Sequence, residues 1–514
     1  MEDKVQSLLP FKHLLKDNLI GLEKEALRSH IKGGITQSPH PKKLGSALTN
    51  KFITTDFSES LLEIVTPPLK GAKATLDFLE NIEYVVNTKL PDDEILWHQS
   101  MPCVIRDETT IPLAQYGSSN IAKMKTVYRN GLGLRYGRTM QTIAGIHFNY
   151  SFSKQFIKEY QQSINNSQNT QDFINDVYMG ISRNVLRYNW FLTYLFGASP
   201  IVCKSFLNNY HKHSLIEFNN TSLFEPFATS LRVGDIGYQN NKEDKLGVKA
   251  NYNNLLQYVN SLEVATQTPC TNYQKIGLKK DNQYQQLNTN ILQIENEYYS
   301  SIRPKQLTSE LQTISKALKE KGVLYIELRM LDINPLLPLG IDEEQILFIE
   351  VFLLFCLLEK SPAICSNEQV EIDNNNNIVA HNGRQNDINL HHQQAPISLK
   401  EYGKKLLEKI SIVLPLLETK HQNAFNKISE RIYDTSKTPS AILLKTLKDN
   451  KVGFFDWTQQ SSIQNKINSL KKNNHNNKII TQVKNECQNS IVKQKIIENN
   501  DTLSFEKYLK KYYE

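Results

Sequence analysis

Acidic side chains recur in segments whose pattern is otherwise typical of β-strands. Glu23 and Glu25 lie two residues apart in GLEKEALR, Glu63 lies inside LLEIV, and Glu327 lies inside YIELR. Because side chains alternate between the two faces of a strand, Glu23 and Glu25 face the same side. Carboxylates are normally kept out of apolar strands, since burying an unpaired charge is unfavourable. Any one of these acids is explained by a solvent-facing position on an open sheet, but their recurrence is harder to explain in that way.

Convergence of these acids would require cations. Asp56, Glu295 and Glu297 lie in similar segments, TTDFSESLLEIVTP and LQIENEYY. Two carboxylates ~4 Å apart repel by roughly 4 kcal/mol at an effective dielectric near 20. Oxygen ligands favour magnesium or manganese over zinc. His147, in the strand-like segment TMQTIAGIHFNY, could add one nitrogen ligand, although a lone histidine in a strand is more often structural.

Three arginines are candidates for binding anions. Arg329 lies two residues after Glu327, so both side chains face the same side of the strand. An arginine beside a metal-binding acid suits a phosphoryl group in transfer, and a plain ion pair is the alternative. Arg232, in FATSLRVGDIGY, and Arg303, in IRPK, are the other two, with surface exposure as the alternative for each.

Motifs of several other kinds of active site are missing. The sequence contains no GxxxxGK[ST] phosphate loop, no GxSxG and no HExxH, and residues 131–137 (GLGLRYG) do not match the dinucleotide fingerprint. Six cysteines lie far apart without zinc spacing. Any bound phosphates must therefore be held mainly by metals and by arginine or lysine side chains.

The composition is that of a soluble globular chain. Of 514 residues, 39% are hydrophobic and 22% charged, and a net charge of +7 does not by itself indicate a nucleic-acid binder. The basic residues 471–478 lack interleaved aromatics. The longest apolar stretch, 346–358, is too short to span a bilayer and predicts a buried helix. The first residues lack a signal-peptide pattern, so we expect a cytoplasmic protein that binds neither membrane nor nucleic acid.

Strand-like and helical patterns alternate from residue 18 to about 362. Strands are predicted over 139–150 and 324–331, and helices over 74–90, 172–193, 252–266 and 343–358, the last with Asp342 as its N-cap. A polar loop with an asparagine run is predicted over 366–394, followed by helices over 399–417 and 422–433 and a basic helical stretch. The fold class is therefore α+β, with a mostly antiparallel sheet and a helical C-terminal part. We divide the chain into a catalytic core (1–362), a helical continuation with the asparagine-rich loop (363–460) and a basic helical tail (461–514).

Ten segments taken together are similar to those of one family. They are, in order, GLEKEALR, LGSALTNKFITTDFSESLLEIVTP, SMPC, LAQYGSSN, KTVYRNGLGLRYG, MQTIAGIHFNYSF, YLFGASP, FATSLRVGDIGY, NTNILQIENEYYSSIRPK and YIELRMLDINPLLPLGID. Their order and spacing resemble the proteobacterial type of glutamate–cysteine ligase, also called γ-glutamylcysteine synthetase. The resemblance spans residues 21–342 and continues more weakly to about 457. The asparagine-rich segment 366–394 and the tail after 457 depart from it.

The resemblance implies a fold related to glutamine synthetase, in which a curved antiparallel sheet forms a funnel with metals and ATP on its concave side. Five side chains fall where the family holds divalent metals: Glu23, Glu25, Glu63, His147 and Glu327. Arg329 falls where the family steadies the transferred phosphoryl group, and Arg232 falls near the glutamate substrate. The cysteine side of the cleft is matched by Tyr128, Gln141, Tyr238, Tyr298 and Arg303, with Asp56 nearby.

The implied activity joins the γ-carboxylate of L-glutamate to the amine of L-cysteine, the first step of glutathione synthesis. A carboxylate is a poor electrophile, and phosphoryl transfer from ATP converts it into an acyl phosphate that the amine can attack. Arg329 would offset charge on the transferring group, and Asp56 would take the proton of the amine. Magnesium is the expected cofactor, with manganese as the alternative. We also expect feedback inhibition by glutathione and a monomeric state.

Three alternative functions remain open. Another ATP-dependent carboxylate–amine ligase of the same fold would keep the metal-binding acids and differ around Tyr128, Tyr238 and Tyr298. A metal-dependent phosphohydrolase would suit the clustered acids but would not require the aromatic pocket. A non-enzymatic binding protein is disfavoured, because Glu327 and Arg329 are both present.

Overall fold

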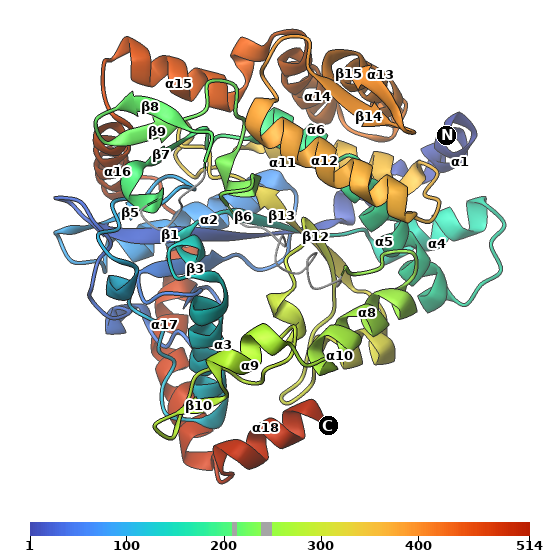
Figure 1. The fold of residues 1–514 in the computed structure, drawn as a ribbon. Helices are drawn as coiled ribbons and strands as arrows, with labels where there is room; N and C mark the ends of the chain where they lie inside the picture. Colours follow the sequence, from blue (N-terminus) through green and yellow to red (C-terminus); the bar gives the residue numbers. More distant parts are fainter. Residues whose placement is uncertain (208–212, 238–248) are drawn as a thin grey trace.

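One antiparallel sheet lies at the centre of the structure, a computed structural model that describes residues 1–207, 213–237 and 249–514 (Figure 1). Within these residues, six of its strands follow the order β12–β13–β6–β1–β3–β2, and β4 and β5 also pair with β1. Every pairing in this sheet is antiparallel. The strands are β1 (Leu19–His30), β2 (Ile53–Thr55), β3 (Leu61–Val65), β4 (Leu69–Lys70), β5 (Glu94–Trp97), β6 (Ile146–Ser151), β12 (Ile302–Lys305) and β13 (Tyr325–Leu331).

The two faces of the central strand β1 have different surroundings. On one face, Lys24 forms a buried ion pair with Glu83 of α2 (Ala72–Asn87). Tyr150 of β6 lies on the same face of the sheet, close to Glu350 of α11 (Glu343–Leu358). Helices α2 and α11 therefore cover this face, and Glu23 and Glu25 point from the other one.

Helix α11 is apolar along most of its length, and all of its residues from Gln345 onward are buried. Its N-cap is Asp342, whose side chain accepts a hydrogen bond of 2.8 Å from the Gln345 amide, as predicted. A helix that is apolar on all sides must be enclosed by other elements. Here α2, α5 and α14 pack around it.

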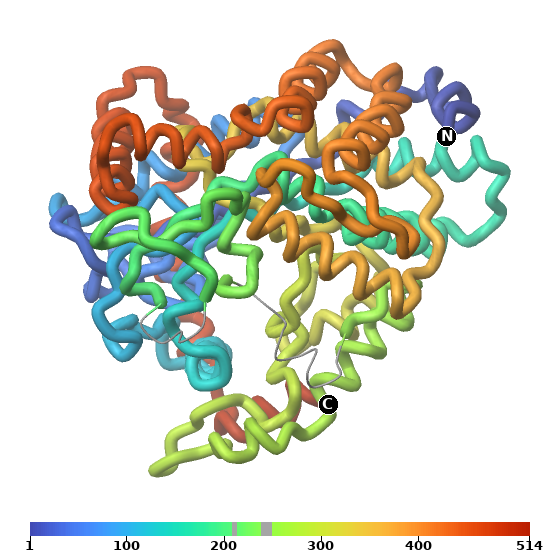
Figure 2. Tube along the Cα trace, turned by 45° about the horizontal axis from the view of Figure 1, so that its top comes forward, coloured from blue at the N-terminus to red at the C-terminus, as the bar shows by residue number. Residues whose placement is uncertain are grey.

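The other helices surround the sheet and make up most of the C-terminal third, and the two chain termini lie far apart in both views (Figures 1 and 2). They are α1 (Glu2–Leu8), α3 (Asn120–Tyr136), α4 (Lys154–Ser163), α5 (Thr170–Arg187), α6 (Asn189–Phe196), α8 (Leu255–Gln267), α9 (Thr271–Ile276), α10 (Ile314–Lys321), α12 (Ser366–Asn382), α13 (Leu399–Ser411), α14 (Thr419–Tyr433), α15 (Pro439–Asp449), α16 (Phe454–Lys471), α17 (Asn477–Asn500) and α18 (Phe505–Tyr513). In the described part of the chain, three smaller sheets are formed by β7 (Ile201–Cys203), β8 (Ile216–Asn219) and β9 (Ser222–Phe224), by β10 (Lys279–Lys280) and β11 (Gln283–Tyr284), and by β14 (Asn389–His392) and β15 (Ala395–Ser398). The predicted α+β class and the helical C-terminal part are confirmed.

The prediction of an asparagine-rich loop over 366–394 was wrong. Residues Ser366–Asn382 form α12, which contains the whole asparagine run, and β14 and β15 form a hairpin after it. The helix buries Ile372 and Val379, and Asn375 between them donates a hydrogen bond of 2.7 Å to the His391 carbonyl and accepts one of 2.8 Å from the His391 amide. These contacts stabilise a helix that the polar composition alone does not indicate.

Two strand predictions also needed correction. The strand expected over 139–150 begins only at Ile146, and Gln141 lies in a 3-10 turn, η4 (Met140–Thr142). Glu295 and Glu297 lie in another 3-10 turn, η7 (Glu295–Glu297), rather than in a strand. The helix expected over 172–193 is interrupted at Tyr188, between α5 and α6.

The C-terminal segment is helical and packs against the rest of the chain. Helices α16 and α17 both contact α2, and the Ser46 amide donates a hydrogen bond of 3.0 Å to the Ser490 hydroxyl of α17. The division into 1–362, 363–460 and 461–514 stays a prediction, and its second boundary falls inside α16. Among the residues described, no helix is both long and apolar enough to cross a membrane.

Candidate active site

The register of four neighbouring strands brings the five predicted metal ligands onto one face of the sheet. Glu23 of β1 lies opposite His147 of β6, and Glu327 of β13 lies opposite Asn149 of β6. On the other side of β1, Glu25 lies opposite Glu63 of β3. Directly paired residues in an antiparallel sheet point to the same face, so residues far apart in the sequence become neighbours here.

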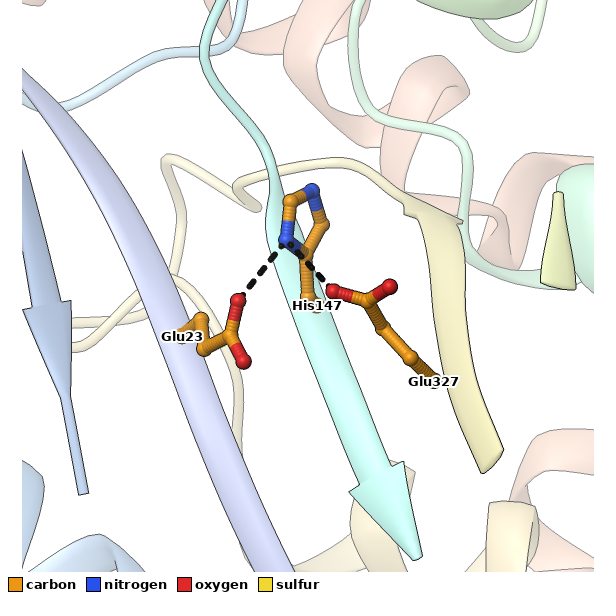
Figure 3. Close-up of side chains that lie close together, drawn as sticks. All are labelled: Glu23, His147 and Glu327. Atoms are coloured by element: carbon orange, nitrogen blue, oxygen red, sulfur yellow. Dashed lines mark hydrogen bonds and ion pairs between the residues drawn. The ribbon is translucent and has the colours of Figure 1, made fainter. Parts of the chain in front are cut away.

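Three of these side chains form a compact cluster (Figure 3). His147 Nδ1 lies 3.2 Å from Glu23 Oε2 and 3.6 Å from Glu327 Oε1, and one ligand atom from each residue lies within 4.8 Å of the others. Asn149 Nδ2 donates a hydrogen bond of 2.7 Å to Glu23 Oε1, while its Oδ1 is buried without a hydrogen-bond partner in the described part of the chain. Asn149 was missed by the sequence analysis, although its spacing of two from His147 places it on the same face.

The charge state of this cluster suits metal binding. Burial alone would raise the pKa of Glu327, but Lys305, Arg329 and His147 together hold that pKa well below its usual range. Lys305 Nζ lies 3.3 Å from Glu327 Oε2, and Arg329 Nη1 lies 3.1 Å from Glu327 Oε1. Burial and the nearby Arg329 lower the pKa of His147. The carboxylate is therefore ionised and the imidazole neutral, the forms that bind a metal.

Glu25 and Glu63 show the repulsion expected of acids that face one another. Burial, followed by the charge of Asp56, raises the pKa of Glu25 to about 8. Burial and then the charges of Glu23, Asp56 and Glu25 raise the pKa of Glu63. A cation between these groups would remove the repulsion, so the four carboxylates and one imidazole fit hard divalent cations.

Two arginines lie beside the acids with donors to spare. Arg232 is fully buried, and its Nη2 donates a hydrogen bond of 2.9 Å to the Arg329 carbonyl. The Nε and Nη1 of Arg232 and the Nε of Arg329 are buried and have no hydrogen-bond partner in the described residues. An added Cβ at Gly145 would overlap the Arg232 guanidinium, so Gly145 lets that group lie against the sheet. Buried guanidinium donors without partners suit an anionic substrate.

A second group of side chains lies around α3. Burial and then Glu297 raise the pKa of Tyr128, whose phenol also lies within electrostatic reach of Arg303, Arg129 and Asp56. Asp56 is held by Arg129, whose Nε donates to its carbonyl and whose Nη2 lies 3.9 Å from its carboxylate. The structure therefore brings three predicted residues together here, Tyr128, Arg303 and Asp56, with Arg129 as a fourth that the sequence analysis missed.

Three predicted residues of the cysteine side remain. Arg303 donates to the Tyr298 carbonyl, and the Tyr298 hydroxyl accepts a hydrogen bond of 3.1 Å from the Ala250 amide. Gln141 is buried in η4. Tyr238 lies outside the described residues.

A cavity of about 550 Å³ adjoins Tyr298 and Ser301 and is lined on another side by Asn376 and Asn377 of α12. The Arg329 amide donates a hydrogen bond of 2.8 Å to the Ser301 carbonyl, which connects the cavity to the strand of the metal cluster. None of the five predicted metal ligands lines the cavity. We therefore expect the chemistry at the clustered acids rather than in this cavity.

Comparison with known proteins identifies one family. The sequence model of the family described as glutamate-cysteine ligase matches residues 6–379. The glutamate–cysteine ligase of Alcanivorax borkumensis is 42% identical over 503 residues, which cover 96% of this chain and 95% of that protein. The glutamate–cysteine ligase of Pseudomonas putida KT2440 is 45% identical over 454 residues, 87% of this chain and 86% of that protein.

A solved structure is similar over nearly the same extent. The glutamate–cysteine ligase of Francisella tularensis in complex with AMP has a TM-score of 0.91 and 34% identity, covering 96% of this chain and 97% of that one. A bifunctional glutathione synthetase from Pasteurella multocida has a TM-score of 0.72 and 26% identity, covering 91% of this chain and 54% of that one. The departure of the C-terminal tail from the family stays a prediction: the alignment with the Alcanivorax borkumensis enzyme covers 96% of this chain, that with the Pseudomonas putida enzyme covers 87%, and the family model ends at residue 379.

Proposed function

Because the chain belongs to the glutamate–cysteine ligase family, we propose that it uses ATP and Mg²⁺ to join the γ-carboxylate of L-glutamate to the amine of L-cysteine. The observation that carries this proposal is the cluster of Glu23, His147 and Glu327 beside Arg329. It is supported by the similarity of almost the whole chain to the structure of a glutamate–cysteine ligase in complex with AMP. The cluster supports phosphoryl-transfer chemistry, and the family membership supports the pair of amino-acid substrates.

Divalent cations would be held by two sets of residues. Glu23, His147 and Glu327 form one, and Glu25 with Glu63 the other. A bound cation neutralises charge on the ATP phosphates and on the carboxylate that is phosphorylated. The predominance of oxygen ligands favours Mg²⁺, with Mn²⁺ as the alternative.

Arginines bind the reacting anions. Arg329, beside Glu327 and with an Nε that has no partner among the described residues, faces the transferring phosphoryl group and offsets its charge. Arg232 offers two donors without partners in the same part of the chain to a carboxylate of glutamate, and a guanidinium holds a carboxylate with two such donors better than an ammonium does. Both side chains are held in place before the substrate arrives, which lowers the entropy lost on binding.

The amine substrate lies on the α3 side. Tyr128, Gln141, Tyr238, Tyr298 and Arg303 form the proposed cysteine pocket. Asp56 takes the proton of the attacking amine, and Arg129 keeps its carboxylate near the pocket. Feedback inhibition by glutathione in competition with glutamate, a monomeric state and a cytoplasmic location, where ATP is supplied, belong to the same proposal.

The experiment is phosphate release from Mg-ATP and glutamate, with and without L-cysteine, together with mass detection of γ-glutamylcysteine. We expect release to depend strongly on cysteine and the dipeptide to form. Release that ignores both amino acids would indicate a phosphohydrolase. Release that requires a different amine would indicate a sister ligase of the same fold.

A further inference from the structure

The last fourteen residues are anchored to the start of α3, the helix that carries Tyr128. In Figure 1, α17 runs beside α3 and α18 crosses below it. Asp501 accepts hydrogen bonds from the backbone amide of Asn120 and, at 2.6 Å, from its side chain, which also donates to the Leu503 carbonyl at 2.8 Å. Glu498 accepts a hydrogen bond of 2.9 Å from the Ser118 amide. Two acids of the tail thus lie at the positive end of the α3 dipole.

An apolar cluster joins α18 to the middle of α3. Its buried members are Met124 of α3, Leu287 of the loop after β11, and Tyr508 and Leu509 of α18, and Tyr128 packs against them. A helix of nine residues is not stable alone in water. The stability of α18 therefore derives from this packing, and the packing in turn limits the movement of α3.

A short chain of hydrogen bonds connects the end of α18 with the backbone of Tyr128. The Tyr513 hydroxyl donates a hydrogen bond of 2.8 Å to the Gln293 carbonyl. The side-chain Nε2 of Gln293 donates a hydrogen bond of 3.2 Å to the Tyr128 carbonyl, and the backbone N–H of Gln293 donates one of 2.7 Å to the Glu297 carboxylate. An added Cβ at Gly131 would overlap the side-chain amide of Gln293, so the loop that carries Gln293 lies directly against α3.

We propose that α18 is a positioning element for the amine side of the active site, acting through Tyr128. Tyr513 fixes Gln293 and thereby the Tyr128 carbonyl, and Leu509 fixes the turn of α3 from which the Tyr128 phenol projects toward Arg303 and Asp56. The proposal rests on the proposed function, since it takes Tyr128 as part of the cysteine pocket. The residues proposed for glutamate and ATP lie on β1, β3, β6, β13 and η6 (Leu231–Val233), outside these contacts, so the effect should be confined to cysteine.

The test compares Leu509→Ala and Tyr513→Phe with Glu506→Gln, all on α18. Glu506 forms an exposed ion pair with Lys279, away from Tyr128 and Gln293, and serves as the matched control. We expect the KM for cysteine to rise about threefold or more in the first two variants, because Tyr513→Phe loses the hydrogen bonds of the hydroxyl with the Gln293 carbonyl and the Asn288 side chain, and Leu509→Ala loses buried packing. The KM values for glutamate and ATP should stay unchanged, and Glu506→Gln should behave as the wild type.

A double-mutant cycle asks whether the effect passes through Tyr128. In a Tyr128→Ala background, Tyr513→Phe should produce no further rise in the KM for cysteine. Additive effects, an unchanged KM for cysteine in both α18 variants, or an equal rise in all three KM values would overturn the inference. If Leu509→Ala does not fold, Tyr513→Phe decides alone. A wild-type enzyme that makes no γ-glutamylcysteine refutes the proposed function instead, which keeps the two failures distinct.

Discussion

Glu23 and His147 face each other across β1 and β6, with the imidazole Nδ1 3.2 Å from a carboxylate oxygen of Glu23. The two residues are 124 positions apart, and the register of the two strands alone brings them together. Glu327 completes the cluster from β13, on the other side of β6. The proposed metal site is thus built on backbone hydrogen-bonded strands, which hold side chains more rigidly than loops do.

Glu327→Gln should reduce formation of γ-glutamylcysteine by more than about 100-fold, because the amide keeps the shape of the side chain but not its charge. The loss of charge also leaves Lys305 and Arg329 without their shared acid. Dipeptide formation is measured by mass spectrometry, and Mn²⁺ binding by calorimetry. Weaker Mn²⁺ binding should accompany the loss of activity.

The matched control for that variant is Glu401→Gln, an exposed acid of α13 that pairs with Lys405. It should retain full activity, since exposed pairs contribute little. Near-normal activity and Mn²⁺ affinity in Glu327→Gln would remove Glu327 from the metal site.

Gly145→Ala should lower kcat/KM for glutamate by about tenfold or more, because the new methyl group displaces the Arg232 guanidinium and forfeits a charged hydrogen bond. The kcat/KM for glutamate is measured by steady-state kinetics with glutamate as the varied substrate. Gly180→Ala is the control, since an added Cβ in α5 makes only ordinary contacts there. Unchanged kinetics in Gly145→Ala would mean that the position of Arg232 is not critical for glutamate.

The strands and acids of the site could be predicted because they carry strong local signals. In β13, apolar Ile326 and Leu328 alternate with Glu327, and a carboxylate in such a segment has few structural explanations. Asn149 and Lys305 were missed because asparagine and lysine are ordinary on a strand surface. Only the strand register shows that both contact the ligands.

Other features depend on partners that are distant in the sequence. Glu297 was interpreted as a strand acid, but it forms a buried ion pair of 2.9 Å with Arg135, 162 residues away. Helix α12 was missed because asparagine favours loops, and the bond from Asn375 to His391 that stabilises it belongs to a hairpin formed later in the chain. No local pattern reports either contact.

Lys24→Ala should lower the free energy of unfolding by about 3–5 kcal/mol, because it leaves Glu83 buried and unpaired behind β1, the strand that carries Glu23 and Glu25. Burial outweighs the attraction of Lys24 and raises the pKa of Glu83, so the intact pair adds little net stability. Replacing both residues, Lys24→Met with Glu83→Leu, should therefore recover most of the loss. Urea unfolding measures these differences.

A surface pair supplies the control for that series. Lys70→Ala removes the exposed pair with Asp17 and should leave the free energy of unfolding nearly unchanged, because solvent screens an exposed pair. If the double variant at positions 24 and 83 is as unstable as Lys24→Ala, the buried pair itself is a major source of stability.

Acid should destabilise the protein through two buried histidines. Burial and Lys24 lower the pKa of His98 to about 3, and burial and Arg28 lower that of His40 to about 4. An unfolded histidine has a pKa near 6.5, so below that pH the unfolded chain takes up protons that the folded chain refuses. The stability that these two histidines contribute is therefore fully present above about pH 6.5 and is lost as the pH drops toward 4, while Glu25, with its pKa raised to about 8, contributes in the opposite sense over that range.

The size of this loss follows from linkage. Each histidine contributes up to about 1.4 kcal/mol per pH unit, or about 2.7 kcal/mol for the two. His381 does not obscure the effect. Burial lowers the pKa of His381, but Asp235 and Glu225 outweigh burial and raise that pKa to about 9, so the contribution of His381 to stability changes only above pH 6.5. Urea unfolding between pH 6.5 and 5 should show that the free energy of unfolding declines less steeply in His98→Gln than in the wild type. The glutamine amide can still donate to the Leu337 carbonyl, which His98 contacts at 2.5 Å. The same slope in wild type and variant would show that His98 takes up its proton equally well in the folded chain.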